Sequence, residues 1–305
     1  MRTAATLAIL VAVTALSGGC SGAATQPVAT ATTSPSTVAS TTADPSPSAP
    51  PSPSPSPTAE PTPSEPVGAE EVTVFLVRDA AGSLWVEPMT VALQEPTLGV
   101  ARAAMTVLFR GVAPDPALGT PANPSTEVLG ADIAGGVLTV DVSSAVREPV
   151  QGSAAETAFA QQLAHTGAQF DGVDAVALWV EGEPITELWG HVDWSEPITP
   201  DALAVSPMTV TEPAWGARVP TGEVTVAGEA NVFEATVALR LLGPDGAVVE
   251  ETFTTATCGT GCRGTWSHTF PVPTAGRWTI EAAETDPSDG EGRPPFTVRV
   301  PFRVN

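Results

Sequence analysis

Two cysteines, Cys258 and Cys262, flank a Gly-Thr-Gly turn, and His268 follows six residues later. These residue types could form a disulfide, or they could bind a metal ion together. Structural zinc needs four ligands, and closer cysteine spacing is usual at such sites. In an exported protein, two cysteines across a short turn favour a disulfide. The sequence therefore predicts a Cys258–Cys262 disulfide that stabilises the fold by roughly 2 kcal/mol, and it predicts no metal site.

The glycines of this segment, Gly259, Gly261 and Gly264, match the letters of a dinucleotide-binding fingerprint. That fingerprint requires a helix directly after the glycines. The residues that follow alternate as a strand instead, so we expect no nucleotide. The chain also has no Tyr, and all 12 of its basic residues are Arg. This composition excludes a P-loop lysine, a Schiff-base lysine and a tyrosine nucleophile.

Hydrolysis would need a serine triad or a pair of carboxylates. No Gly-x-Ser-x-Gly elbow precedes a predicted helix, so a triad has no anchor. The acids Asp171, Asp174, Glu181 and Glu183 lie at predicted turns and a strand end, which is more typical of solvated residues than of a glycosidase pair. His165 lies off the apolar stripe of its predicted helix, so we expect it to be solvated. We therefore expect no catalytic residues, no cofactor and no enzyme activity.

An acidic turn contains Asp286, Asp289 and Glu291, which offer oxygen ligands for calcium. Their spacing is not that of an EF-hand, and Asp-Gly turns are common in hairpins. A hairpin turn is therefore the preferred interpretation of this segment.

Seven Trp residues dominate the small aromatic content of the chain. Three of them, Trp189, Trp194 and Trp215, lie near predicted strand ends or turns, where an exposed ring can stack on a sugar. They are the candidate surface for a ligand or partner. Packing in the core and at domain junctions is the preferred interpretation of the Trp residues as a group.

The formal net charge is −22, which argues against binding of nucleic acid through its phosphates. Residues 68–305 alone hold 31 acidic residues against 11 Arg. The acidity therefore belongs to the part expected to fold. It indicates solubility outside the cell and repulsion from anionic surfaces.

Residues 1–20 have the pattern of an export signal. Arg2 precedes an apolar run of 13 residues, which is too short to span a bilayer as a helix. The run ends in Leu-Ser-Gly-Gly-Cys20, which resembles a bacterial lipobox, although the Leu lies four residues before the Cys instead of three. The resemblance implies acylation of Cys20 and a lipid anchor on the outer face of the cell membrane. A secretory signal with an incidental cysteine is the alternative.

Residues 21–67 contain 12 prolines among Ala, Ser and Thr. Such a segment has little to bury and cannot offset its conformational entropy, so we predict a disordered linker. Its 47 residues could extend to roughly 145 Å as polyproline II. A ligand for a proline-binding groove is the less favoured alternative.

The remaining residues, 68–305, are long enough for two domains. The first alternates strand and helix signals, with strands expected at 71–78, 83–91, 136–143, 173–181 and 188–194 and helices at 98–110 and 154–170. Thr97 and Ser153 are the expected helix caps, Glu156 completes a capping box with Ser153, and Gly111 ends the first helix. This pattern predicts an α/β or α+β domain with helices packed on a sheet.

After residue 205 the helical period disappears. Short strands recur, separated by Gly, Pro and Asp turns, at 206–212, 223–229, 233–242, 246–255, 264–272, 277–285 and 295–304. About seven strands over this length predict an immunoglobulin-like sandwich.

Particular stretches of both domains resemble known families. The first domain resembles a GerMN domain, through 74–77 (VFLV), 103–111 (AAMTVLFRG), 136–143 (GVLTVDVS), 152–156 (GSAAE) and scattered positions within 161–182. The second resembles the immunoglobulin-like Gmad2 domain, through 213–216 (PAWG), 224–235 (VTVAGEANVFEA) and 264–266 (GTW).

The resemblance implies a GerMN α/β sandwich over 68–195 and a Gmad2 sandwich over 196–305, an α+β fold overall. One departure is Gly167, where the family usually has Leu; a glycine weakens a helix by roughly 1 kcal/mol. The family has no established catalytic residues. It implies a non-enzymatic surface lipoprotein of actinobacterial type that binds an envelope protein, in a sporulation/germination-family or signalling accessory role; sporulation itself is not implied. Binding of peptidoglycan through exposed Trp is the alternative.

Overall fold

The computed structural model describes residues 71–93, 99–148, 152–285 and 292–305. The predicted signal, Cys20, the linker, Thr97 and the acidic turn at 286–291 lie outside these residues. No helix within the described ranges is long and apolar enough to cross a membrane.

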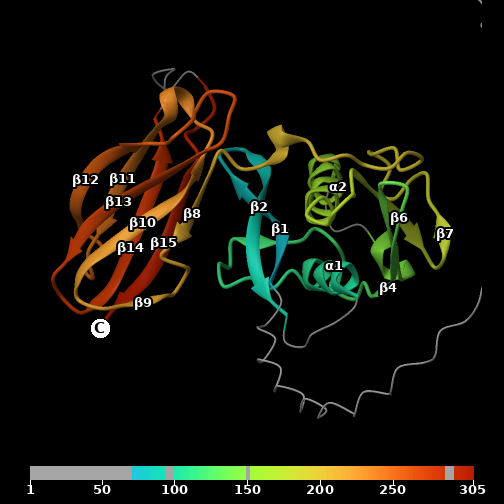
Figure 1. The fold of residues 1–305 in the computed structure, drawn as a ribbon, viewed down its shortest axis with the longest axis horizontal. Helices are drawn as coiled ribbons and strands as arrows, with labels where there is room; N and C mark the ends of the chain where they lie inside the picture. Colours follow the sequence, from blue (N-terminus) through green and yellow to red (C-terminus); the bar gives the residue numbers. More distant parts are fainter. Residues whose placement is uncertain (1–70, 94–98, 149–151, 286–291) are drawn as a thin grey trace, which may run out of the picture. The chain divides into compact units, whose positions relative to one another are not determined.

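The first folded part consists of two sheets with a helical layer between them (Figure 1). Its main elements are β1 (Glu71–Ala80), β2 (Ser83–Ala92), α1 (Val100–Arg110), β3 (Leu118–Gly119), β4 (Val128–Ala134), β5 (Val137–Val142), η1 (Ser144–Arg147), α2 (Ser153–Gly167), β6 (Ala175–Val180) and β7 (Glu183–Pro184). The sheet orders are β2-β1-β3 and β4-β5-β6-β7. Both helices contact β1, and α1 also contacts β4 while α2 contacts β6. Among the described residues, this arrangement leaves one face of the four-stranded sheet without a helix.

The alternating pattern of the strands explains this layering. In β5 and β6 every second side chain is buried under the helices, and these two strands run parallel, as expected for strands joined through a helix. Side chains from both helices and both strands form the buried core beneath the helices. They include Leu108, Phe109, Leu138, Phe159, Leu163, Val176 and Leu178. The predicted α/β packing of this domain is therefore confirmed.

Helix ends and two strands differ in part from the predictions. Gly111 ends α1 in the left-handed region, with φ of 59°, as predicted. The predicted cap at Ser153 is wrong, because Gly152 is the N-cap of α2 and Ser153 is its first helical residue. The strand expected at 188–194 is an irregular loop, and β4 was not predicted because its Gly, Asp and Ala residues have low strand propensity.

Gly167 lies at the end of α2 where the helix packs directly on the sheet. A Cβ on this residue would overlap the side chain of Val176 and press on that of Leu138. The glycine therefore permits the close approach of helix and strand, which is a larger effect than its weak helix propensity.

We expect Gly167→Ala to lower the free energy of unfolding by up to about 2 kcal/mol. The gain in helix propensity is about 1 kcal/mol, but overpacking of a filled core costs about 1–3 kcal/mol. Chemical denaturation of the variant measures the difference. Ala168→Gly, at the exposed next position, is the control, and a Gly167→Ala protein more stable than wild type would contradict the packing argument.

The second folded part is a sandwich of two sheets. Its elements are η2 (Ala202–Ala204), β8 (Met208–Glu212), β9 (Arg218–Val219), β10 (Gly222–Ala230), η3 (Phe233–Ala235), β11 (Thr236–Leu242), β12 (Val248–Thr255), β13 (Gly264–Val272), β14 (Gly276–Glu284) and β15 (Thr297–Val304). The sheet orders are β13-β10-β8 and β12-β11-β14-β15-β9. All seven predicted strands are present, and only the short β9 was not predicted.

Candidate functional site

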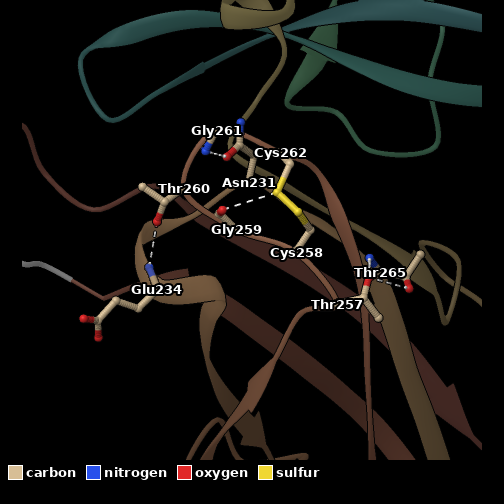
Figure 2. The surroundings of a disulfide bond; sticks show 9 residues. All are labelled: Asn231, Glu234, Thr257, Cys258, Gly259, Thr260, Gly261, Cys262 and Thr265. Atoms are coloured by element: carbon tan, nitrogen blue, oxygen red, sulfur yellow. Dashed lines mark hydrogen bonds between the residues drawn. A yellow bond between two sulfur atoms is a disulfide. The ribbon is translucent and has the colours of Figure 1, made fainter.

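A loop closed by a disulfide lies against the turn before β11 at one end of the sandwich (Figure 2). Cys258 and Cys262 are bonded, with their Cα atoms 5.7 Å apart, so the predicted disulfide is present in the structure. We call residues 231–235 and 257–265 together the disulfide cap. It contains residues 231–235 of the 224–235 stretch and residues 264 and 265 of the 264–266 stretch that resemble Gmad2.

Hydrogen bonds connect the two halves of the cap. The amide of Gly261 donates to the side-chain oxygen of Asn231 over 2.9 Å, and the amide of Thr260 donates to the carbonyl of Val232 over 3.0 Å. The amide of Glu234 donates in turn to the hydroxyl of Thr260 over 3.0 Å (Figure 2). The disulfide loop therefore fixes the conformation of the 231–235 turn.

The backbone of the cap is strained. Glu234, Ala235 and Thr260 have φ of 51°, 56° and 49°, in the left-handed region that residues with a side chain rarely adopt. A Cβ on Gly259 would overlap the backbone of Ala235, and one on Gly264 would overlap that of Cys258. Two glycines of the rejected nucleotide fingerprint thus serve close packing. Strain of this kind persists only where the surroundings enforce it, and it is concentrated at functional sites.

The strained turn exposes one large apolar side chain. Phe233 is 48% exposed at the start of η3. Glu234 beside it is exposed, and its carboxylate points away from the disulfide (Figure 2). A rigid exposed aromatic side chain next to a charge is a typical anchor for a protein partner.

We expect the double variant Cys258→Ser/Cys262→Ser to be less stable by roughly 2 kcal/mol, because the five-residue ring no longer restricts the unfolded chain. The amides of Thr260 and Gly261 should also lose protection from hydrogen exchange, because the loop no longer holds its hydrogen bonds. Hydrogen exchange with mass spectrometry checks this, with strand β14 as the internal reference. Unchanged protection in the cap would show that the hydrogen bonds alone fix it.

Of the three candidate Trp residues, Trp194 belongs to the core of the first domain, and the partly buried Trp189 packs against that core. Trp194 is 5% exposed, and the rings of Trp189 and Trp194 lie 5.3 and 6.1 Å from that of Phe159. Glu156, which is fully buried, accepts hydrogen bonds from the Trp189 amide (3.1 Å), the Trp194 indole (3.0 Å) and the His191 amide (2.8 Å). Trp194 therefore offers no ring face to a ligand, and Glu156 holds the 186–194 loop instead of completing a capping box.

The most exposed Trp among the described residues is Trp179, at 36%, whereas Trp215 is half-buried in the loop before β9. Trp179 lies on the sheet face that no helix in the described ranges covers. It pairs with Asp141 on β5, which in turn pairs with Gly130 on β4. The sequence contained a signal for this exposure, because Trp179 alternates with the buried Leu178 and Val180.

The acids considered for glycoside cleavage do not form a pair. Asp171 and Asp174 precede β6, whereas Glu181 and Glu183 follow it, and all four are exposed. A six-residue strand separates the two groups by about 20 Å. Within the described part of the chain, no three His, Cys, Asp or Glu residues lie together in a way that could hold a metal ion.

The prediction that His165 is solvated is wrong. Its Nε2 lies 2.9 Å from the carbonyl oxygen of Asp201, and its ring lies 5.0 Å from that of Phe75. Burial lowers the pKa of His165. The reason is that Gln161 binds the backbone of Thr199 and Asp201 and so places this segment across the same face of α2.

The fold and the cap define a protein with an α+β domain followed by an immunoglobulin-like domain. Residues 73–186 match the Germane family, described as "Sporulation and spore germination". Residues 208–291 match Gmad2, the "Immunoglobulin-like domain of bacterial spore germination". The chain therefore belongs to the spore-germination type of protein in which a GerMN domain is followed by Gmad2. Neither matched family is a known enzyme family. No curated protein matches the chain.

Several solved structures are also similar, two of them GerMN domains. The tandem GerMN domains of the sporulation protein GerM from Bacillus subtilis share 16% identity, with a TM-score of 0.39, over 48% of this chain and 51% of that one. The first GerMN domain of GerM alone shares 20% identity, with a TM-score of 0.36, over 43% of this chain and 97% of that one. A putative lipoprotein from Clostridium perfringens shares 14% identity, with a TM-score of 0.32, over 45% and 92%. The chain thus spans about half the length of the tandem structure, and these likenesses carry no argument about function.

Proposed function

We propose that this chain is a non-enzymatic lipoprotein of the bacterial envelope that presents its GerMN and Gmad2 domains to another envelope protein. In this proposal Cys20 carries the lipid, and residues 21–67 are the tether that extends the domains from the outer face of the membrane. The role is that of a germination-family or signalling accessory protein.

The observation that carries the proposal is the disulfide cap. A strained turn, fixed by a disulfide loop, exposes Phe233 where burial would be the ordinary outcome for Phe. A pre-ordered aromatic anchor loses little conformational entropy on binding, which favours recognition of a protein.

A photo-crosslinking residue at position 233 of the full chain, in living cells of the source bacterium, tests the cap. We expect a covalent product with one envelope protein. Position 203 is the control, because Leu203 is 80% exposed but lies outside the cap. Absence of a product at 233, or the same products from both positions, would count against the proposal.

The lipid anchor has its own test. Cys20→Ala should release the chain from the membrane fraction and abolish incorporation of a labelled fatty acid. Cys258→Ser/Cys262→Ser is the control, because those cysteines are bonded to each other. A Cys20→Ala chain that still labels and sediments with membranes would contradict lipidation at this residue.

A second candidate function is binding of wall glycan, and the exposed face around Trp179 favours it. The ring stands beside Asp141, and Gly130 one strand further adds no side chain that would block a sugar. Trp179→Ala should reduce sedimentation with purified peptidoglycan, whereas Trp215→Ala, at the half-buried ring, serves as the comparison. Equal sedimentation of wild type and both variants would exclude this candidate.

A further inference from the structure

The outer face of the five-stranded sheet carries four charged side chains in one line across the strands. Glu251 on β12, Arg240 on β11, Glu281 on β14 and Arg299 on β15 are neighbours in register. Arg240 binds Glu251 over 2.9 Å and Glu281 over 3.2 Å, and Arg299 binds Glu281 over 2.7 Å. We call these four residues the charge row.

Stability explains only part of the charge row, because the Glu281 side chain is 9% exposed and needs the two Arg residues that bind it. The side chains of Arg240, Glu251 and Arg299 are 49%, 62% and 68% exposed. Exposed ion pairs of this kind contribute about 0–1 kcal/mol each. The three exposed charges of Arg240, Glu251 and Arg299 on one sheet face therefore suggest recognition by an outside surface.

The order of the signs identifies that surface. From β12 to β15 the charges are negative, positive, negative and positive. A rotation of 180° can place a second copy face to face with this sheet. The rotation axis lies in the interface, parallel to the strands and above the space between β11 and β14. The second copy then presents the four charges in the reversed order. Glu251 then faces Arg299 of the second copy, and Arg240 lies opposite the position of its Glu281, which is buried between two Arg side chains. The row is therefore complementary to itself, as the interface of a twofold dimer requires.

The residues beside the row fit the same rotation. A second row of residues lies two positions further along the same four strands. It consists, in register, of Phe253, Ala238, Ala283 and Thr297. The rotation places the bulky Phe253 opposite the smaller Thr297 and the two alanines opposite each other. Phe253 is 67% exposed, and Val248 and Val249 on the same strand are 52% and 53% exposed. Exposed apolar side chains concentrated on one edge strand mark an interaction surface.

We infer that this sheet face binds a second copy of the chain through a twofold interface. Pairing of opposite charges fixes the register, and Phe253 supplies apolar area at each edge of the interface. The interface lies on the sheet face of β11, β12, β14 and β15, so this inference is independent of the partner proposed for the disulfide cap.

Sedimentation velocity tests the inference on the full chain carrying Cys20→Ser, which removes the lipid but no domain. We expect a reversible monomer–dimer equilibrium at concentrations up to about 100 μM, because an interface of this kind is weak. Glu251→Arg and Arg299→Glu should each weaken the dimer by about tenfold or more, since each places like charges at both ends of the row. Glu223→Arg, exposed on the opposite sheet, should leave the equilibrium unchanged.

Mixing the two variants gives the decisive result. In a mixed dimer, Arg at position 251 of one copy faces Glu at position 299 of the other, so all four charge pairs are restored. We expect Glu251→Arg and Arg299→Glu proteins to form a heterodimer although each alone is monomeric. A monomeric wild type, variants as dimeric as wild type, or no association on mixing would overturn the inference.

Discussion

Arg78→Met is expected to lower the free energy of unfolding by about 3–5 kcal/mol, the loss typical when one partner of a buried ion pair is removed. Arg78 on β1 is 7% exposed and binds two buried acids, Glu87 on β2 and Asp115 in the loop after α1. Its Nε and Nη2 donate to the two oxygens of Glu87 over 2.7 and 3.0 Å, and Nη2 also donates to Asp115 over 2.6 Å. Without the guanidinium, two carboxylates remain buried without a counterion.

The loss of unfolding free energy caused by Arg78→Met should depend on pH. Burial raises the pKa of Glu87, and this outweighs the lowering effect of Arg78. A carboxyl group whose pKa is raised by folding stabilises the fold most below its unfolded pKa, and the stabilisation is lost as pH rises through the folded pKa. Removal of Arg78 raises that folded pKa further. The difference between wild type and Arg78→Met should therefore be small in acid and widen from about pH 4 upward.

Differential scanning calorimetry of both proteins at several pH values measures this. Arg303→Met is the matched control, since Arg303 is exposed on β15 and should change stability by less than about 0.5 kcal/mol. The neutral triple variant Arg78→Met/Glu87→Gln/Asp115→Asn should lose the pH dependence even if it is not fully stable. A constant deficit from acid to neutral pH would refute the ion-pair explanation.

The strands of the second domain were predictable from the sequence because their signal is local. Residues such as Val224 and Val226 alternate with exposed neighbours, and Gly and Pro mark the turns. The disulfide was equally local, because Cys258 and Cys262 span one turn. Both predictions needed only the nearest residues along the chain.

The interactions that the sequence did not reveal join positions far apart in the chain. Asp115 lies 37 residues from Arg78, and a buried triad of this kind has no spacing rule to identify it. His165 appeared solvated because helical periodicity considers only its own helix, whereas Asp201 contacts it from a distant segment. Phe233 stood inside a recognised stretch, but its exposure depends on the left-handed backbone of the turn that follows.

Glu156 also makes long-range contacts that the sequence did not reveal, although it lies in a correctly predicted helix. The sequence placed it three residues after Ser153 and so indicated a local cap. Instead, its carboxylate accepts hydrogen bonds from residues 33 to 38 positions later in the chain. Its place in the first turn of α2 also favours a negative charge there, because the helix dipole is positive at that end.

We expect Glu156→Gln to lower the free energy of unfolding by about 3 kcal/mol, although the two side chains have nearly the same shape. Each of the three donors from the 186–194 loop points at a carboxylate oxygen, and glutamine replaces one oxygen with an NH2 group, itself a donor. In one orientation that group faces the His191 amide; in the other it faces the amide of Trp189 and the indole of Trp194. Either way a buried donor loses a charged acceptor, and hydrogen bonds to charged groups contribute about 1.5–3 kcal/mol.

Calorimetry gives the stability of the Glu156→Gln protein, and near-ultraviolet circular dichroism reports on the packing of Trp189 and Trp194 against Phe159. We expect a weaker aromatic signal together with the lower transition temperature, because the loop that carries both rings is held by Glu156. Glu187→Gln is the matched control, since Glu187 lies in the same loop but is exposed. If Glu156→Gln were as stable as Glu187→Gln, the loop would be held by aromatic packing alone. The buried carboxylate would then have no structural role, and a ligand-binding or catalytic role for Glu156 would have to be tested instead.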